Sequence, residues 1–450
     1  MEIKLPPNVK KAISLLESAG FEVCAVGGCV RDSLLRKTPD DWDITTSASP
    51  EQMKEVFSSF HCIETGIQHG TLTVIIGSPL EITTFRLDGE YEDNRHPKSV
   101  EFTSDLSADL ARRDFTVNAM AYSPSQGLSD PFGGQEDLKN HIIRCVGEAD
   151  RRFNEDALRI LRGLRFASVL DFEIEDKTAE SIHKNKVLLK NISVERISKE
   201  LMRLICGAGA HRVLSGFADV LFEIMPELSP MYKNSHDNPH HCYDIYEHTL
   251  YSLENVRPDP VLRFAMLLHD SGKPASKTFS QDGRAHFYGH QKLSAELAAQ
   301  ILARLKVPNS FRDEVLFLVG NHDRWELYEK PENMKKYLAR FGLDRVLELL
   351  EVMRADVLSQ SPEYRFRLEK IENAERTAKE IAALKPCLSL KSLAVNGKTL
   401  MANGIPEGKT LGAVLSALLG EVIDGKTKNS SEELIRRAKE IFEEQSGEKT

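Results

Sequence analysis

The stretch that decides the fold is Val26–Ile44, with the sequence VGGCVRDSLLRKTPDDWDI. The apolar run Phe21–Val26 before it predicts a buried strand, Gly27–Gly28 a tight turn, and Val30–Leu35 the opening of a helix. Glycines let a bound anion approach the backbone, and a helix N-terminus offers unpaired N–H groups. Arg31 adds a fork of charged donors. The segment is therefore typical of a phosphate-binding turn, although a plain strand-to-helix turn has the same pattern.

Two carboxylates, Asp41 and Asp43, lie two positions apart near the end of this stretch. Residues i and i+2 of a strand point to the same side, so both carboxylates would face one volume. Two like charges held together need a cation. Ligands that are all oxygen favour Mg²⁺, which proteins bind through one or two carboxylates plus substrate phosphates and water. The pair therefore predicts a Mg²⁺ site, with a solvated pair in a loop as the alternative.

A third carboxylate, Glu81, lies in a predicted hairpin. Thr71–Ile76 (TLTVII) and Glu81–Phe85 (EITTF) both have the composition of strands. If the second strand lies beside the Asp41 strand, Glu81 completes a catalytic three-carboxylate cage with Asp41 and Asp43. If it does not, Glu81 is an ordinary edge-strand charge.

Four motifs together resemble the class II nucleotidyltransferases, the family of CCA-adding tRNA nucleotidyltransferases and bacterial poly(A) polymerases. They are the GGCVRD turn, the DDWDI strand, RRDFTVNAM at Arg112–Met120 and EDALRILRGLRF at Glu155–Phe166, in the family's order. The resemblance implies a polymerase β-like head that binds the triphosphate through Gly28, Arg31 and Arg113, with Asp114 and Asn118 supporting the site. It also identifies the polar segment Arg86–Phe102 as the family's mobile loop, which favours an enzyme able to add A. Taken alone, the RRD run has a solvated charge cluster as its alternative.

The segment Glu155–Phe166 predicts one amphipathic helix with Asp156, Arg159, Arg162 and Arg165 on its polar side. A solvated face is the ordinary interpretation of such a pattern. In the functional interpretation, Asp156 accepts from an exocyclic amine while Arg159 donates to ring acceptors, which suits cytosine and adenine. Guanine and uracil would place a carbonyl oxygen against the carboxylate. The resemblance implies this role for Glu155, Asp156 and Arg159, with Arg162 and Arg165 near the triphosphate or the base.

Histidines mark the second half of the chain, where eight of the fourteen lie between residues 236 and 322. The segments EHTL, LLHDSGKP, HFYGH and GNHD resemble an HD phosphohydrolase domain. The predicted ligands of one or two divalent transition metals are His248, His269, Asp270, His290, His322 and Asp356, with His286 as a further candidate. A metal-bound water there would attack a phosphoester, and a vestigial site without activity is the alternative.

Composition narrows the class of protein. The chain has 450 residues, too many for one core, and a net charge of −9, which argues against a generally basic nucleic-acid binder. Arginines nevertheless outnumber acids between Arg144 and Phe166, so a locally positive groove is possible. The seven cysteines form no CxxC pair and are predicted to be reduced, and no apolar run reaches the ~18 residues of a membrane span. These features predict a cytoplasmic protein with no membrane partner.

The sequence therefore predicts an α+β protein. A small α/β nucleotidyltransferase head with a mixed sheet spans residues 1–140, a helical neck 141–225, a helical HD body 226–360 and a helical tail 361–450. The predicted function is template-independent addition of CCA to the 3′ end of tRNA from CTP and ATP with Mg²⁺. The alternatives are addition of A alone, poly(A) synthesis, or a phosphohydrolase whose head only binds nucleotide. The chain's end is not strongly basic, which favours tRNA over a poly(A) product.

Overall fold

The computed structural model describes residues 2–89 and 100–447 and divides the chain into two compact units. The first unit comprises Met1–Ser229 and Gln300–Pro308 and contains the large sheet. The second comprises Pro230–Ala299 and Asn309–Thr450 and is helical apart from one short hairpin. The predicted α+β class is confirmed, while the four-domain division stays a prediction.

A seven-stranded mixed sheet forms the centre of the first unit. Its strand order is β3 (Cys62–Ile63), β4 (Thr71–Ile76), β5 (Ser78–Thr84), β2 (Asp43–Thr46), β1 (Val23–Val26), β8 (Ala121–Ser123) and β9 (Gly127–Ser129). The pair β2–β5 is parallel and the other pairs are antiparallel. The predicted strand before the glycine turn and the predicted β4–β5 hairpin are confirmed.

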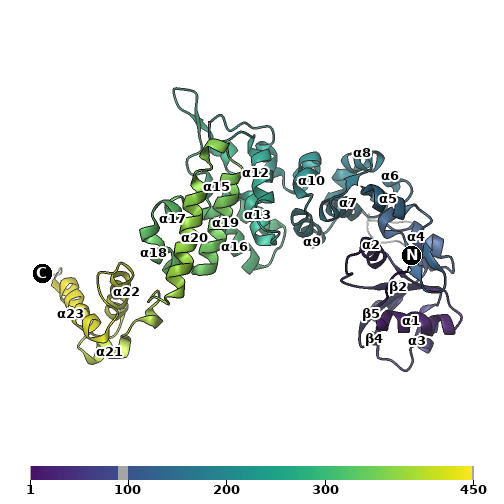
Figure 1. The fold of residues 1–450 in the computed structure, drawn as a ribbon, viewed down its shortest axis with the longest axis horizontal. Coiled ribbons are helices and arrows are strands. Elements are labelled where there is room, and N and C mark those ends of the chain that lie inside the picture. Colours follow the sequence, from purple (N-terminus) through teal and green to yellow (C-terminus); the bar gives the residue numbers. More distant parts are fainter. Residues whose placement is uncertain (1, 90–99, 448–450) are drawn as a thin grey trace. The chain divides into compact units, whose positions relative to one another are not determined.

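One face of this sheet is covered by α1 (Pro7–Ser18) and α3 (Pro50–Val56), drawn in purple in Figure 1. Val9, Ile13 and Leu16 of α1 are fully buried, as their helical spacing predicts, and they pack in one core with residues of β4 and β5. The N-terminus of α3 is fixed by a capping box, in which Ser49 and Gln52 satisfy each other's backbone N–H groups.

The other face packs against α4 (Leu106–Ala111) and the residues just before β8. The glycine turn leads into α2 (Gly28–Leu34), and the apolar run FTVNAMAY forms a 3₁₀ turn, η2 (Thr116–Asn118), followed by β8. The predicted loop 86–102 begins and ends in a two-stranded ribbon, β6 (Arg86–Asp88) with β7 (Val100–Phe102). Its middle, residues 90–99, lies outside the described residues, so the prediction of a mobile loop stays a prediction.

The helical part of the first unit departs from the sequence prediction at one point. Instead of one helix over 155–166, α6 (Ala149–Glu155) ends and α7 (Leu158–Leu170) begins, with Asp156 extended between them at φ −137°. The Asp156 carboxylate accepts from the N–H of Leu158 at 3.0 Å, and this short-range bond competes with continuation of the helix. The remaining elements are α5 (Gly134–Asn140), β10 (Ile142–Ile143), β11 (Glu173–Ile174), α8 (Asp176–Asn185), η3 (Lys186–Asn191), α9 (Val194–Ile205), α10 (Ala210–Gly216), α11 (Ala218–Ile224) and η4 (Pro226–Met231).

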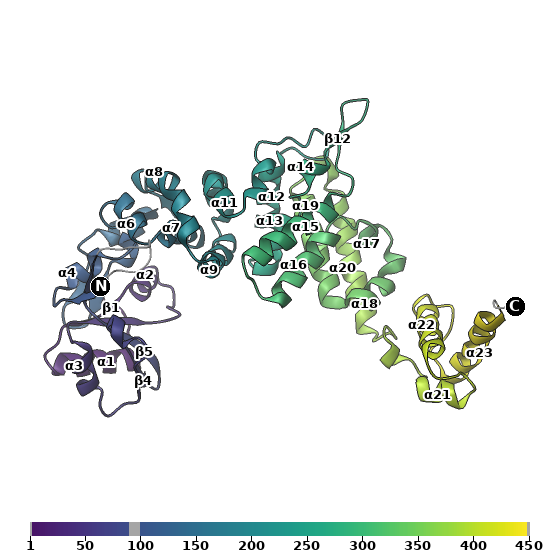
Figure 2. The same cartoon turned by 180° about the vertical axis from the view of Figure 1, so that it is seen from behind.

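The second unit is a set of packed helices, best followed from behind in Figure 2. They are α12 (Ile245–Glu254), α13 (Pro260–Leu268), α14 (Lys273–Ser276), α15 (His290–Arg304), α16 (Asn309–Asn321), α17 (Glu326–Glu329), α18 (Met334–Phe341), α19 (Leu343–Leu358) and α20 (Arg367–Ala383), with the hairpin β12 (Thr278–Phe279) and β13 (Ala285–His286). Towards the C-terminus, α21 (Gly397–Ala402), α22 (Lys409–Ile423) and α23 (Ser431–Gly447) share a small core of their own. Across the described helices, none combines the length and the apolar character needed to span a bilayer.

Candidate functional site

The glycine turn at the end of β1 requires glycine for two reasons. Gly27 has φ +81°, a left-handed conformation that side chains rarely adopt, and a Cβ there would come within 3.0 Å of Nη1 of Arg113. Gly28 follows as the first residue of α2, where a Cβ would lie 3.6 Å from Nη2 of Arg31. The turn thus brings two arginines that are distant in sequence to the same backbone.

A chain of charge-assisted hydrogen bonds connects four of the predicted nucleotide-binding residues. Arg31 Nη1 donates to Asn118 Oδ1 at 2.7 Å, and Asn118 Nδ2 donates to Asp114 Oδ1 at 3.2 Å. Arg162 Nε donates to Asp114 Oδ2 at 2.7 Å. Although burial opposes it, the Arg162 guanidinium together with Asn118 lowers the pKa of Asp114 to about 2. The network holds Asp114 ionised and fixes Arg31 and Arg162 around one edge of the site.

The three predicted metal carboxylates lie at neighbouring strands. The parallel register places Glu81 of β5 directly beside Asp43 of β2, so the predicted adjacency of these two strands is confirmed. The prediction that Asp41 lies in the same strand is wrong. β2 begins at Asp43, and its pairing with β1 runs from Ile44 to Thr46, so Asp41 lies in the loop before the strand.

These carboxylates have the chemistry of an open Mg²⁺ site. Asp41, Asp43 and Glu81 are all exposed, and within the described parts of the chain no hydrogen bond or ion pair engages their carboxylate oxygens. Although Asp43 keeps an exposed edge, local desolvation raises its pKa, as do the charges of Asp41 and Glu81, while Arg113 opposes them. Oxygen-only donors left free for a cation fit Mg²⁺, which completes its shell with water and substrate phosphates.

Arg113 is held in place by a residue that the sequence analysis did not single out. Asp109 of α4 is fully buried, and its Oδ2 lies 3.4 Å from Arg113 Nη2. Its Oδ1 accepts from Nε and Nη2 of Arg112 at 2.9 and 2.8 Å. The sequence carried a signal, because an acid three and four residues before two arginines is a helical ion-pair spacing.

Glu155 and Arg159 are engaged with each other. Glu155 accepts from Arg151 at 3.1 Å, from Arg152 at 2.9 Å and from Arg159 Nη1 at 2.8 Å. Arg159 Nη2 donates to the carbonyl of Arg112 at 2.9 Å, and the residue is 8% exposed. The alternative interpretation, a solvated helix face, does not apply to Arg159, because its guanidinium is bonded and buried, while its role in nucleotide binding stays a prediction.

Two residues of α9, both outside the predicted site, contact predicted site residues. Arg196 Nη2 donates to Asp156 Oδ2 at 2.9 Å, and Glu200 forms a buried ion pair with Arg165 at 2.6 Å. Arg165 also lies 3.9 Å above the ring of Phe166, within cation–π distance. No periodic pattern reveals these contacts, which join residues about 35 to 40 positions apart.

All six predicted ligands of the second unit converge, and they fall into two groups of three whose ligand atoms lie within 4.8 Å of one another. One group is His248, His269 and Asp356, and the other is Asp270, His290 and His322. Asp270 lies between them. Its Oδ2 is 3.5 Å from His248 Nε2 and 3.2 Å from His269 Nε2, while its Oδ1 is 3.5 Å from His290 Nε2 and 3.7 Å from His322 Nε2.

The four histidines present the same nitrogen to this cluster. Each Nδ1 lies next to a backbone carbonyl: His248 at 3.2 Å from Ser359, His269 at 2.7 Å from Met266, His290 at 2.9 Å from Phe287 and His322 at 2.7 Å from Val319. A carbonyl only accepts, so Nδ1 carries the proton, and in a neutral ring Nε2 is left as a lone-pair donor. His286 is not part of the cluster, because it sits on the hairpin strand β13 with its Nε2 3.2 Å from Ser280 Oγ.

A cavity of about 380 Å³ opens over this cluster and contains cations as well as ligands. Its lining includes Lys273 and Arg367. Lys273 is 6% exposed, and its Nζ lies 2.7 Å from Asp270 Oδ2 and 3.2 Å from His236 Nε2. His236, which the sequence analysis did not select, is stacked on His241 at 3.7 Å.

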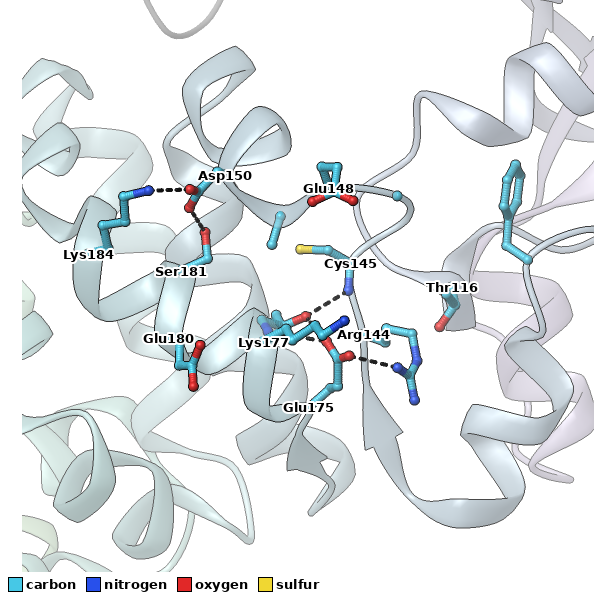
Figure 3. A pocket seen from close by; sticks show the side chains of 14 residues that line it. Thr116, Arg144, Cys145, Glu148, Asp150, Glu175, Lys177, Glu180, Ser181 and Lys184 are labelled. Carbon is cyan, nitrogen blue, oxygen red and sulfur yellow. Dashed lines mark hydrogen bonds and ion pairs between the residues drawn. The ribbon is translucent and has the colours of Figure 1, made fainter.

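Figure 3 shows a second cavity, of about 470 Å³, in the first unit. Its charged residues are largely paired with each other: Lys184 with Asp150, and Arg144 Nη1 with Glu175 at 2.7 Å. Asp150 also accepts from Ser181 Oγ. None of the predicted nucleotide or metal residues lines it.

Family models match most of the chain. The Poly A polymerase head domain matches residues 23–144, and the model described as "Probable RNA and SrmB- binding site of polymerase A" matches 171–231. The model described as "tRNA nucleotidyltransferase domain 2 putative" matches 284–438.

Relatives and solved structures agree with these models. The CCA-adding enzyme of Ligilactobacillus salivarius is 33% identical over 446 residues, 98% of each chain. That of Lactobacillus helveticus is 48% identical over 231 residues, 50% of this chain and 57% of the relative. The crystal structure of the Bacillus stearothermophilus CCA-adding enzyme in complex with CTP is 30% identical, covers 99% of this chain and 100% of its own, and superposes with a TM-score of 0.73.

Proposed function

This chain belongs to the family of CCA-adding enzymes, and we propose that it adds C, C and A to the 3′ end of tRNA. CTP and ATP are the substrates and pyrophosphate leaves. The observation that carries the proposal is the meeting of the glycine turn, the Asp43–Glu81 strand pair and the arginine network in one unit. The same enzyme would act in the cytoplasm, where its seven free cysteines remain reduced.

Binding of the triphosphate falls to the glycine turn and to arginines. The backbone at Gly28 approaches the phosphates, and Arg31 and Arg113 supply charge. Arg31 is oriented by Asn118, and Arg113 by the buried Asp109. Holding the α-phosphate in one position relative to the tRNA 3′ end is the largest contribution that these residues can make.

Asp41 and Asp43, with Glu81 beside them, would hold Mg²⁺. When bound, Mg²⁺ lowers the pKa of the attacking 3′-hydroxyl and stabilises the charge that develops on the phosphate and on the leaving pyrophosphate. The carboxylates themselves fix where the acceptor end and the triphosphate meet.

The choice of base falls to Asp156 and Arg159. An ionised carboxylate accepts from the exocyclic amine of cytosine or adenine, whereas the carbonyl oxygen of uracil or guanine in the same place is repelled. Arg159 donates to a ring acceptor once the base displaces part of its present bonding to Glu155 and Arg112. We propose that the growing 3′ end resizes this pocket and so sets the order C, C, A.

Primer extension on a tRNA transcript that lacks CCA tests the proposal. With Mg²⁺, CTP alone should give two additions, and CTP with ATP should give three that end in A. Single addition of A only to an acceptor already ending in CC would mean an A-adding enzyme. A long ladder of A would mean a poly(A) polymerase, and no extension would overturn the proposal.

A second function is favoured by the histidine cluster of the second unit. We infer that it is a metal-dependent phosphohydrolase site, with His248, His269, Asp270, His290, His322 and Asp356 as ligands. Buried imidazole nitrogens left free by bonds at Nδ1 suit a transition metal, which would supply an activated water. Lys273 and Arg367 in the overlying cavity would bind the phosphate of the ester.

This second function is tested with the full chain loaded with Mn²⁺, Co²⁺ or Ni²⁺ in turn. Hydrolysis of a chromogenic phosphodiester, lost in H269A and retained in a D41A/D43A double variant, would support it. A purified chain that binds none of these ions would overturn it.

A further inference from the structure

The carboxylate on which base choice rests is held at both of its oxygens. Asp156 Oδ1 accepts from the backbone N–H of Leu158 at 3.0 Å, and Oδ2 accepts from Nη2 of Arg196 at 2.9 Å. The Asp156 and Arg196 side chains are 18% and 28% exposed, so the pair is shielded well beyond an ordinary surface ion pair. Two contacts at two oxygens fix the plane of the carboxylate as well as its position.

Arg196 reaches Asp156 from a rigid support. It lies in the first turn of α9, which has the buried residues Ile197, Leu201 and Leu204 and packs against α7. Asp156 lies in the extended break before α7. Apart from Arg196, its side chain is held by the hydrogen bond from the backbone N–H of Leu158. The orientation of the carboxylate therefore depends on α9.

Arg196 also has a donor to spare, in contrast to Arg159. Nη1 of Arg196 is buried and has no hydrogen-bond partner among residues 2–89 and 100–447. Both terminal nitrogens of Arg159 are already bonded, to Glu155, to the carbonyl of Arg152 and to the carbonyl of Arg112. Because this nitrogen is shielded from solvent, the contact that Arg196 makes at the site is the one from Nη2 to Asp156.

We propose that Arg196 is a positioning residue for base choice. It holds the Asp156 carboxylate in the orientation that accepts an exocyclic amine. The inference rests on the proposed CCA addition and deepens it. Without Arg196, the carboxylate can turn about its bond to Leu158 and relieve the repulsion that uracil O4 meets. Discrimination should therefore suffer more than catalysis.

Incorporation of a single nucleotide by the full chain, on a tRNA transcript lacking CCA, tests this with CTP and UTP measured separately. In R196A we expect the ratio of kcat/KM for CTP over UTP to fall by about tenfold or more, the size of effect expected when one oriented polar contact is lost. R196K, which keeps a charge and a donor, should recover part of the ratio. The matched control is R212A, which removes another neck arginine whose ion pairs are to Asp171 and Glu173. It should leave the ratio unchanged.

Two results would overturn the inference: an unchanged CTP-to-UTP ratio in R196A, or an equal fall for both nucleotides, which would indicate a structural role only. If R196A does not fold, R196M preserves the length and packing of the side chain without its donors, and the same two results decide. Failure of the proposed function is distinguishable, because the wild-type chain would then incorporate no C at all.

Discussion

The two units each gather carboxylates suited to a cation, but they hold them in opposite ways. In the first unit, Asp43 and Glu81 stand exposed on adjacent strands with no partner fixed to their oxygens among the described residues. In the second unit, Asp270 is 1% exposed and is surrounded by histidines whose rings are locked by backbone carbonyls. The first arrangement suits an ion that arrives with substrate, and the second suits an ion that stays bound.

Burial explains the difference. Desolvating a carboxylate is costly unless opposite charge compensates it. The head avoids this cost at Asp43 by leaving an exposed edge, and meets it at Asp114 with the permanent charge of Arg162. Around Asp270 the compensating charge comes from His269, whose pKa, although burial opposes it, is raised to about 10 by the adjacent Asp270 and Asp356 carboxylates, and from Lys273. We expect a metal bound by the histidine cluster of the second unit to take over this compensation, which the exposed carboxylates of the first unit do not need.

The largest expected effect follows removal of the head carboxylates. The D41A/D43A double variant should lose about a thousandfold or more of its rate of CCA addition at saturating Mg²⁺, about 4 kcal/mol of transition-state stabilisation. Because both side chains are exposed, its melting temperature and the metal content of the second unit should not change. Single-turnover extension and elemental analysis measure the two readouts.

The matched control is D40A, which removes the neighbouring carboxylate that lies outside the D-x-D spacing. It should retain most of the activity. If the double variant lost only about tenfold relative to D40A, a site built around these carboxylates would be excluded.

The next effect is on stability. Dialysis of the full chain against a tight chelator should lower the melting temperature of the second unit, since a ligand present at about a thousand times its dissociation constant contributes about 4 kcal/mol. Adding back a transition metal should restore the melting temperature, whereas Mg²⁺ should not, because imidazole ligands disfavour it. Calorimetry follows both steps. If the purified protein carries no metal and its melting temperature does not change with the chelator, the histidine cluster is vestigial.

The same contrast accounts for what the sequence could predict. The β1 strand, the β4–β5 hairpin and the buried face of α1 follow from local patterns of apolar residues, which report on the core directly. The histidine cluster was equally accessible, because histidine is rare enough for its clustering in sequence to be informative and its ligating chemistry is specific.

The contacts that orient the candidate site of the first unit could not be predicted from such patterns. Arg196 contacts Asp156 across 40 positions, and nothing in the pattern of α9 distinguishes it from a solvated arginine. The break at Asp156 comes from a single side-chain bond that competes with an otherwise good helical sequence. Asp41 falls outside β2, which begins at Asp43, so the D-x-D spacing alone does not predict that both carboxylates lie in one strand.

A smaller effect distinguishes a carboxylate held by arginine from one held by metal. The pKa of Asp114 is lowered from 3.8 to about 2, so the group stabilises the folded state above pH 4 and this contribution is lost as the pH falls from about 4 to about 2. D114N should therefore cost about 2 kcal/mol of unfolding free energy at pH 7. Denaturant titrations at several pH values should show the difference from wild type vanishing near pH 2. A difference that is constant with pH would mean lost packing and not lost charge.

The smallest expected effect is that of altering the histidine cluster of the second unit on CCA addition. Every residue assigned to the addition reaction lies in the first unit, whereas His269 lies in the second, so H269A should leave kcat and KM for addition within about twofold, as expected for sites without shared partners. H286A is the matched control, because this histidine belongs to the same unit but lies outside the cluster. Only H269A should lose bound metal, while both variants extend tRNA normally. A drop in addition confined to H269A, with tRNA binding intact, would mean that the resident metal of one unit controls the chemistry of the other.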